Sequence, residues 1–194
     1  MASEVDICNQ ALANIGAEAL IAALTDQTEE ARYCNLYYTG LRDNLLRTHP
    51  WNFALKFQTL ADLGSAPSGW TYRYAYPADC IRALEIVNTA NDNVLKFEVG
   101  SDGSSGKVIL TDQATAELRY VASVTDPNAM DVGFRQVLSW AIAYHIAEPL
   151  TGSSSKRNDA LTVYTNMIRQ VTASDSEEGA TDPDIDATWV TARL

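Results

Sequence analysis

A run of alternating aromatic residues between positions 69 and 82 constrains the fold of this chain more than any other segment. Side chains along a strand point alternately to the two faces of a sheet, so the spacing predicts one strand over 70–76 with its rings on one face. The rings belong to Trp70, Tyr72, Tyr74 and Tyr76. Pro77 has no amide hydrogen for a ladder and ends the strand.

The aromatic face has two interpretations. Aromatic side chains are favoured on pleated, half-buried surfaces, so the rings could form the packed wall of a sheet. Alternatively, they could form a platform on which nucleic-acid bases or sugar rings stack, and such platforms usually have positive charge nearby. Positive charge is scarce in this chain.

The region around this strand has the pattern of an antiparallel sheet. Short alternating runs are separated by clusters of Gly, Pro, Asn and Asp, which supply turns. These connections are too short for crossover helices, so neighbouring strands run antiparallel. We expect strands over 53–63, 70–76, 81–88, 94–99, 107–112 and 116–124.

Two helices are predicted ahead of the sheet. Ser3 followed by Asp6 is a helix start signal, and apolar residues at helical spacing then continue to Gly16, which predicts a helix over 4–15. Asp26 followed by Glu29 is a second start signal. A heptad-like apolar stripe comes after it and predicts a helix over 27–48. Three basic residues of this second helix are expected off its apolar seam: Arg32, Arg42 and Arg47.

Two further helices are predicted after the sheet. The first, over 129–148, is apolar around much of its circumference and is expected to be the most buried helix, ending at Pro149. The second, over 154–173, has one apolar face. The fold class expected is α+β: a four-helix body with an antiparallel β-sheet domain inserted between helices two and three, followed by an extended C-terminal arm.

The chain divides accordingly into four parts. We expect a helical pair over 1–50, the β domain over 51–125, a second helical pair over 126–174 and an acidic arm over 175–194. The arm has little apolar period and could not fold alone. It nevertheless carries Trp189-Val190, which suggests an anchor for a partner, the alternative being a terminus that frays without function.

Charge and targeting patterns narrow the function classes. The chain has 14 Lys and Arg against 25 Asp and Glu, a net charge of −11, so its surface should repel a phosphate backbone. We therefore do not expect sequence reading by DNA contact, whereas letting DNA slide past is compatible with this charge. No signal-peptide pattern and no run of about 20 apolar residues is present, so we expect synthesis in the cytosol and no membrane association.

Three segments resemble functional motifs but do not meet their requirements. Ser153 to Lys156 has the Ser-x-x-Lys spacing without the partner motifs of acyl-transfer enzymes. Gly100 to Lys107 misses the phosphate-loop spacing by one residue. Asp182, Asp184 and Asp186 begin like a calcium loop, but alanine occupies the position that requires glycine.

The remaining reactive side chains predict no cofactor, metal or catalytic group. Cys8, Cys34 and Cys80 are far apart and lack Cys-x-x-Cys spacing, so they read as reduced, buried, small apolar residues. His49 and His145 fit capping or core positions.

Several segments together resemble the tail tubular protein A family of short-tailed bacteriophages, the adaptors of the head-to-tail connector. Residues 7–17 are similar to the family's opening helix, and residues 30–46 with 49–54 are similar to its second helix and the segment directly after that helix. The aromatic segment 70–82 is similar to its most recognisable stretch. The likeness covers about the first half of the chain, and the second half matches in layout and length.

The resemblance implies a structural virion protein rather than an enzyme. Members form a twelve-fold ring between the portal protein and the tail nozzle, a tail tubular protein B-like partner, and leave a channel for double-stranded DNA. On this basis the arm is expected to engage the portal, and the three arginines of the second helix are expected to contact neighbouring subunits or partners. The arm residues concerned are Asp182, Asp184, Ile185, Trp189 and Val190.

Two alternatives remain open. Tail components can degrade glycans or peptidoglycan, and the tyrosine-rich strand could then stack sugars while Glu148 acts as a general acid. The chain could also be another head-completion or stopper protein at a different place in the virion.

Overall fold

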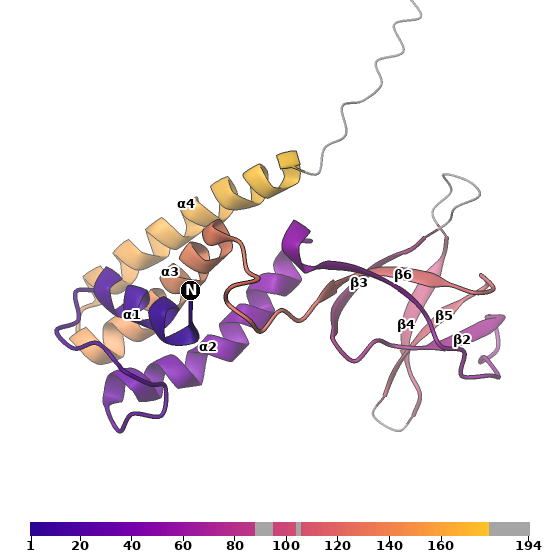
Figure 1. Cartoon of the computed structure of the whole chain (residues 1–194), viewed down its shortest axis with the longest axis horizontal. Helices are drawn as coiled ribbons and strands as arrows, with labels where there is room; N and C mark the ends of the chain where they lie inside the picture. Colours follow the sequence, from indigo (N-terminus) through magenta and orange to yellow (C-terminus); the bar gives the residue numbers. More distant parts are fainter. Residues whose placement is uncertain (88–94, 104–105, 179–194) are drawn as a thin grey trace, which may run out of the picture.

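The computed structural model describes residues 1–87, 95–103 and 106–178. Four helices form a body, and two small antiparallel sheets lie to one side of it (Figure 1). The sheets are inserted between the second and third helices, so the predicted α+β class with an inserted sheet region is confirmed. The arm positions 179–194 lie outside the described residues, and with them Asp182, Asp184, Ile185, Trp189 and Val190.

The helices before the sheets begin at capping side chains. Helix α1 spans Glu4–Asn14, and the Ser3 side chain accepts from the Asp6 amide while the Asp6 carboxylate accepts from the Ser3 amide, which confirms the predicted capping box. Helix α2 spans Glu29–Thr48 and is capped by Thr28. The predicted start at 27 is two residues early because the Asp26 carboxylate instead accepts from amides of the preceding loop.

The helices after the sheets both end later than predicted, and the first of them also begins three residues later, because the Asp131 side chain caps it. Helix α3 spans Val132–Thr151 and includes Pro149, because the exposed last turn continues with a hydrogen bond from the Gly152 amide to the Glu148 carbonyl. Helix α4 spans Ser154–Glu178. Residues 175–178, expected in the extended arm, are therefore helical. Contacts of Asp175 with the chain just after α2 explain why the helix continues.

The strands form two separate three-stranded sheets. The first has the order β1 (Leu55–Thr59), β6 (Glu117–Ala122), β3 (Cys80–Val87), and the second has the order β2 (Tyr72–Ala75), β5 (Lys107–Thr111), β4 (Phe97–Ser101). All pairs are antiparallel, as predicted. The first predicted strand is shorter because a 3₁₀ turn, η1 (Asn52–Ala54), replaces its beginning.

The aromatic segment packs as a wall. The rings of Tyr72 and Tyr74 stack with centroids 6.0 Å apart, and Tyr74 is 3% exposed, with its hydroxyl donating to the Gln113 carbonyl. Tyr72 and Tyr76 are half-buried against the same core. Trp70 precedes β2 and is also half-buried, so the strand predicted over 70–76 is too long at both ends. This packing agrees with the first interpretation of the stripe.

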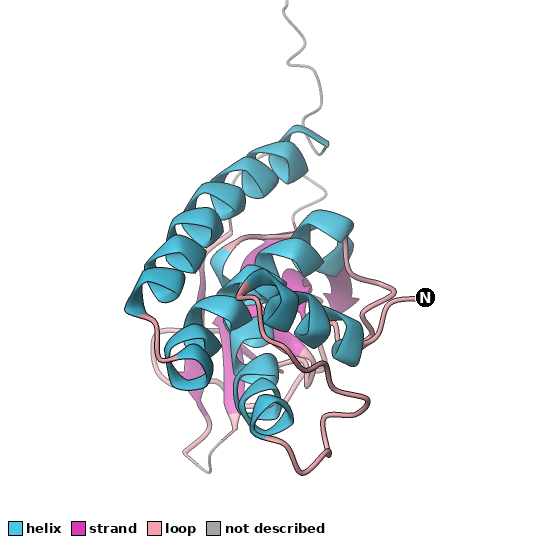
Figure 2. Cartoon of the chain, turned by 90° about the vertical axis from the view of Figure 1, so that its left-hand side faces the viewer, coloured by secondary structure: helices cyan, strands magenta, loops and turns pink. Residues whose placement is uncertain are grey.

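The main core joins the helices to the first sheet. Trp51 is fully buried, its Nε1 donates to the Leu45 carbonyl at 2.9 Å, and its ring meets the ring of Phe134 edge-on at 5.1 Å. Val121 of β6 belongs to the same core. Figure 2 shows the helices in front of the strands, with α4 along the side of the body. The sheet region is therefore packed against the body at the end of α2.

Candidate interaction surfaces

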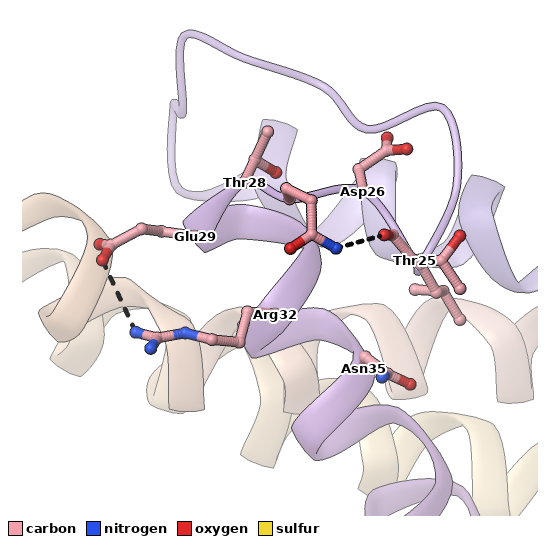
Figure 3. A pocket seen from close by; sticks show the side chains of 8 residues that line it. Thr25, Asp26, Thr28, Glu29, Arg32 and Asn35 are labelled. Atoms are coloured by element: carbon pink, nitrogen blue, oxygen red, sulfur yellow. Dashed lines mark hydrogen bonds and ion pairs between the residues drawn. The ribbon is translucent and has the colours of Figure 1, made fainter.

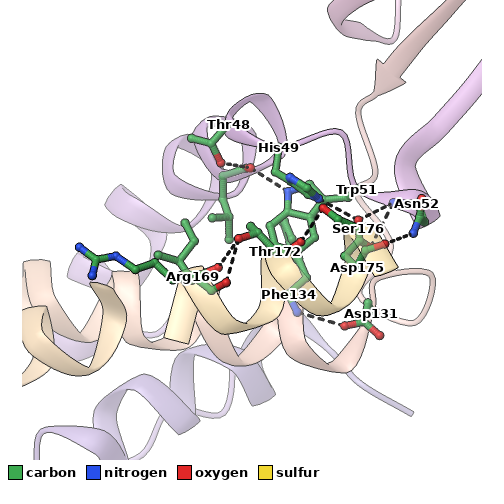
Figure 4. A network of polar contacts seen from close by, with 12 residues as sticks. Thr48, His49, Trp51, Asn52, Asp131, Phe134, Arg169, Thr172, Asp175 and Ser176 are labelled. Carbon is green, nitrogen blue, oxygen red and sulfur yellow. Dashed lines mark hydrogen bonds and ion pairs between the residues drawn. The ribbon is translucent and has the colours of Figure 1, made fainter. Parts of the chain in front are cut away.

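A polar network fixes the end of α4 to the chain that leads into the sheets (Figure 4). His49 follows α2, Asn52 begins η1 and Asp175 lies in the last turn of α4. His49 Nε2 lies 2.9 Å from Asp175 Oδ2, and the side chains are only 17% and 10% exposed. The Asn52 backbone amide donates to both carboxylate oxygens at 3.2 Å, and its side-chain amide donates to the Asp175 carbonyl. Asp175 is thus held through its side chain and its backbone.

A second set of contacts ties the body to β3. Arg47 of α2 donates to the Ile81 carbonyl at 2.6 Å, and Arg82 donates in return to the Arg47 carbonyl at 3.3 Å. Arg47 was expected to contact a partner. Its guanidinium is engaged within the chain, and it contributes to the attachment of the sheet region.

Arg32 lines a hollow at the beginning of α2 (Figure 3). The hollow has a volume of about 500 Å³ and is formed by the connection between α1 and α2 and by the first turns of α2. Arg32 is 67% exposed, lies 3.6 Å from Glu29 and covers the ring of Tyr33. A solvent-exposed ion pair of this kind contributes little to stability, so Arg32 is available to a partner.

Arg42 differs from the expectation that it lies off the apolar seam. It is only 6% exposed, and two of its nitrogens lie 2.8 and 2.9 Å from an Asp43 oxygen. This pairing allows the charge to be buried. With a rise of 1.5 Å per residue, Arg32 and Arg47 are about 22 Å apart along α2, so the three arginines do not form one site.

Glu148, the acid of the hydrolase alternative, is paired with a cation. Arg157 lies 3.0 Å from its carboxylate and also donates to the Tyr144 hydroxyl. Beside them the His145 ring stacks on Tyr37 at 5.0 Å. Burial, together with the charge of Arg157, lowers the pKa of His145. Glycoside hydrolysis usually needs a second carboxyl group opposite the acid, and the contacts of Glu148 in the described residues supply a guanidinium instead.

The three cysteine thiols differ in burial. Cys8 and Cys34 are fully buried free thiols facing each other between α1 and α2, and Cys80 is half-buried. Within residues 1–87, 95–103 and 106–178, no group of three or more His, Cys, Asp or Glu side chains could hold a metal ion. The helices described there include none with the length and apolar character needed to cross a membrane.

Two features of these surfaces were missed from the sequence. Asp175 was assigned to the arm, although Val171 and Asp175 continue the helical spacing of Met167 and could have indicated a longer helix. Strand β1 presents Phe57 with 60% of its surface exposed, and no signal in the sequence distinguishes this edge strand from a covered one.

Comparison of the chain with models of known protein families and with curated proteins finds no match.

Proposed function

We propose that this protein is the head-to-tail adaptor of a short-tailed bacteriophage, a structural virion component that forms a ring between the portal and the tail nozzle. The proposal starts from the likeness of residues 7–17, 30–46, 49–54 and 70–82 to the tail tubular protein A family. The observation that supports it best is the attachment of an inserted sheet region to the end of a four-helix body through His49–Asp175 and Arg47–Ile81.

Such a subunit suits a ring. A ring needs each copy to present two different surfaces to its two neighbours, and a body with a laterally attached sheet region has them. Arg32 and the hollow beside it are exposed on the body, whereas Phe57 is exposed on the sheet region. We assign Arg32 to contacts with a neighbouring copy or partner, and residues 179–194 to the portal.

The charge of the chain suits a channel for DNA. A net charge of −11 per copy disfavours adhesion of the phosphate backbone, so the genome would pass without sequence-specific binding. Partners in this role are the portal protein, the tail nozzle protein and further copies of the chain.

The test is assembly with portal rings from the same phage. The purified chain, alone and mixed with portal, is studied by mass measurement and negative-stain imaging. Twelve-fold rings stacked on the portal are expected. The hydrolase alternative would instead be supported if the chain stays monomeric and does not bind the portal, and if it cleaves glycans and Glu148→Gln abolishes the cleavage.

A variant tests the arm within the same assay. Replacing residues 179–194 by a Gly/Ser segment of equal length should abolish portal binding while leaving the helical circular dichroism signal intact. Full binding by this variant would contradict the assignment of the arm to the portal.

A further inference from the structure

Strand β1 has a free hydrogen-bonding edge. It is the outer strand of its sheet, and of the described residues only β6 pairs with it. The Leu60 amide donates to the Ala116 carbonyl, and in an antiparallel pair residues alternate between facing the partner and facing away. Lys56 and Gln58 therefore turn their backbone groups to β6, and Phe57 and Thr59 turn theirs outward.

This edge is exposed in a way that edge strands usually avoid. Residues 56–59 are all exposed, and the Phe57 side chain is 60% exposed. Free edges with an exposed apolar side chain are templates for another strand. The outer side of β2 is different, because the Leu63 amide donates to the Arg73 carbonyl and the Ala75 amide to the Ala61 carbonyl.

The end of α4 lies next to the beginning of β1. Asp175 is hydrogen-bonded to Asn52, which lies three residues before Leu55, the first residue of β1. The described part of α4 therefore ends close to the beginning of this edge. The five-residue strand is about 17 Å long, and the positions 179–187 can span up to about 30 Å, so residues 188–192 can reach the edge in either direction.

The composition of residues 188–192 fits a strand. They are Thr-Trp-Val-Thr-Ala, and threonine, tryptophan and valine are enriched in strands. They follow a Pro- and Asp-rich stretch that suits a connection. Because side chains alternate along a strand, either Trp189 or Val190 would share the face that carries Phe57.

We propose that residues 188–192 add to the free edge of β1 in the same molecule as a fourth strand of that sheet. The backbone groups of Phe57 and Thr59 gain partners, and the Phe57 ring is covered. Strand addition to a sheet edge is a common mode of peptide recognition. A portal would have to displace the segment from β1, but the docking itself needs no portal and does not rest on the proposed function.

The test is amide hydrogen exchange, followed by NMR, in the full chain without any partner. The variant Trp189→Gly/Val190→Gly removes the strand-forming side chains, and Ala180→Gly/Thr181→Gly is its matched control in the connection. The Phe57 and Thr59 amides are expected to exchange at least about tenfold faster in the first variant than in the wild type or the control. The Gln58 amide, which faces β6, should not change.

Three outcomes overturn the proposal. Equal exchange of Phe57 and Thr59 in both variants and the wild type would show that the edge is free. Protection that changes in β4, the outer strand of the other sheet, and not in β1 would place the segment there instead. Protection of Phe57 that disappears on dilution would assign the added strand to a second copy.

Discussion

His49 and Asp175 are 126 positions apart in the sequence, yet His49 Nε2 lies 2.9 Å from the Asp175 carboxylate (Figure 4). The contact joins the end of α2 to the last turn of α4. Asn52, at the start of the chain leading to β1, donates to the same carboxylate. One side chain thus fixes the end of α4 and the attachment of the sheet region.

Replacing Asp175 should destabilise the fold. In Asp175→Ala the partly buried His49 ring and the exposed Asn52 amide lose their acceptor, and we expect the free energy of unfolding to fall by about 2 to 3 kcal/mol. Urea unfolding measures this change. Glu177→Ala, an exposed position two residues along α4, is the control and should change stability by less than about 0.5 kcal/mol. Equal stability of both variants would mean that the network contributes nothing.

Trp51 should be sensitive to loss of its indole nitrogen. Trp51→Phe keeps an aromatic ring near Phe134 but removes the indole donor to the Leu45 carbonyl, which still accepts from the Thr48 hydroxyl. We expect the loss of this one hydrogen bond to cost about 0.5 to 1.5 kcal/mol. Trp51→Ala also empties a fully buried site and should cost about 3 to 5 kcal/mol. Thermal or urea unfolding tests whether Trp51→Ala costs more stability than Trp51→Phe. Trp70→Phe is the matched control, and a cost as large as that of Trp51→Phe would contradict this account.

The titration of His145 should be shifted towards acid. Burial, with a further contribution from Arg157, lowers its pKa below the ordinary value of 6.5. The unfolded chain therefore takes up the proton first as the pH falls. The stabilising effect of the neutral ring is complete above pH 6.5 and is lost as the pH falls from there through the pKa of the folded state.

NMR can follow this titration directly, because the chain has only two histidines. The His145 ring resonance should show a midpoint below 6.5, and Arg157→Gln should move it upward. His145→Gln assigns the resonance by removing it. A midpoint at or above 6.5 in the wild type would show that the ring is solvated in solution.

The three thiols should differ in accessibility. Cys8 and Cys34 are fully buried, whereas Cys80 is only half-buried, although burial raises the pKa of Cys80 as well. A thiol-specific chromogenic reagent at a mildly alkaline pH should therefore modify Cys80 well before Cys8 and Cys34. In denaturant it should modify all three thiols rapidly. Cys80→Ser should remove the fast reaction. A fast reaction that persists in this variant would show that the contact between α1 and α2 opens readily.

Local patterns in the sequence were sufficient for the types and order of the elements. The helical spacing behind Ser3 predicted α1, and the alternation around Tyr74 predicted a strand with its rings on one face. These patterns come from the repeat of each element, about 3.6 residues in a helix and two in a strand, and a repeat is visible in the sequence alone.

The positions where elements end and the partners of individual charged side chains depended on contacts between distant segments. Asp175 is helical because His49 and Asn52 hold it, and the Arg47 guanidinium is engaged within the chain because Ile81 of β3 supplies its acceptor. The division of six strands into two sheets, and the free edge at Phe57, likewise depend on which strands meet. The sequence by itself determined the α+β order of this protein. Only the tertiary structure decided where its helices end and which surfaces remain open, because those depend on packing between residues far apart in the chain.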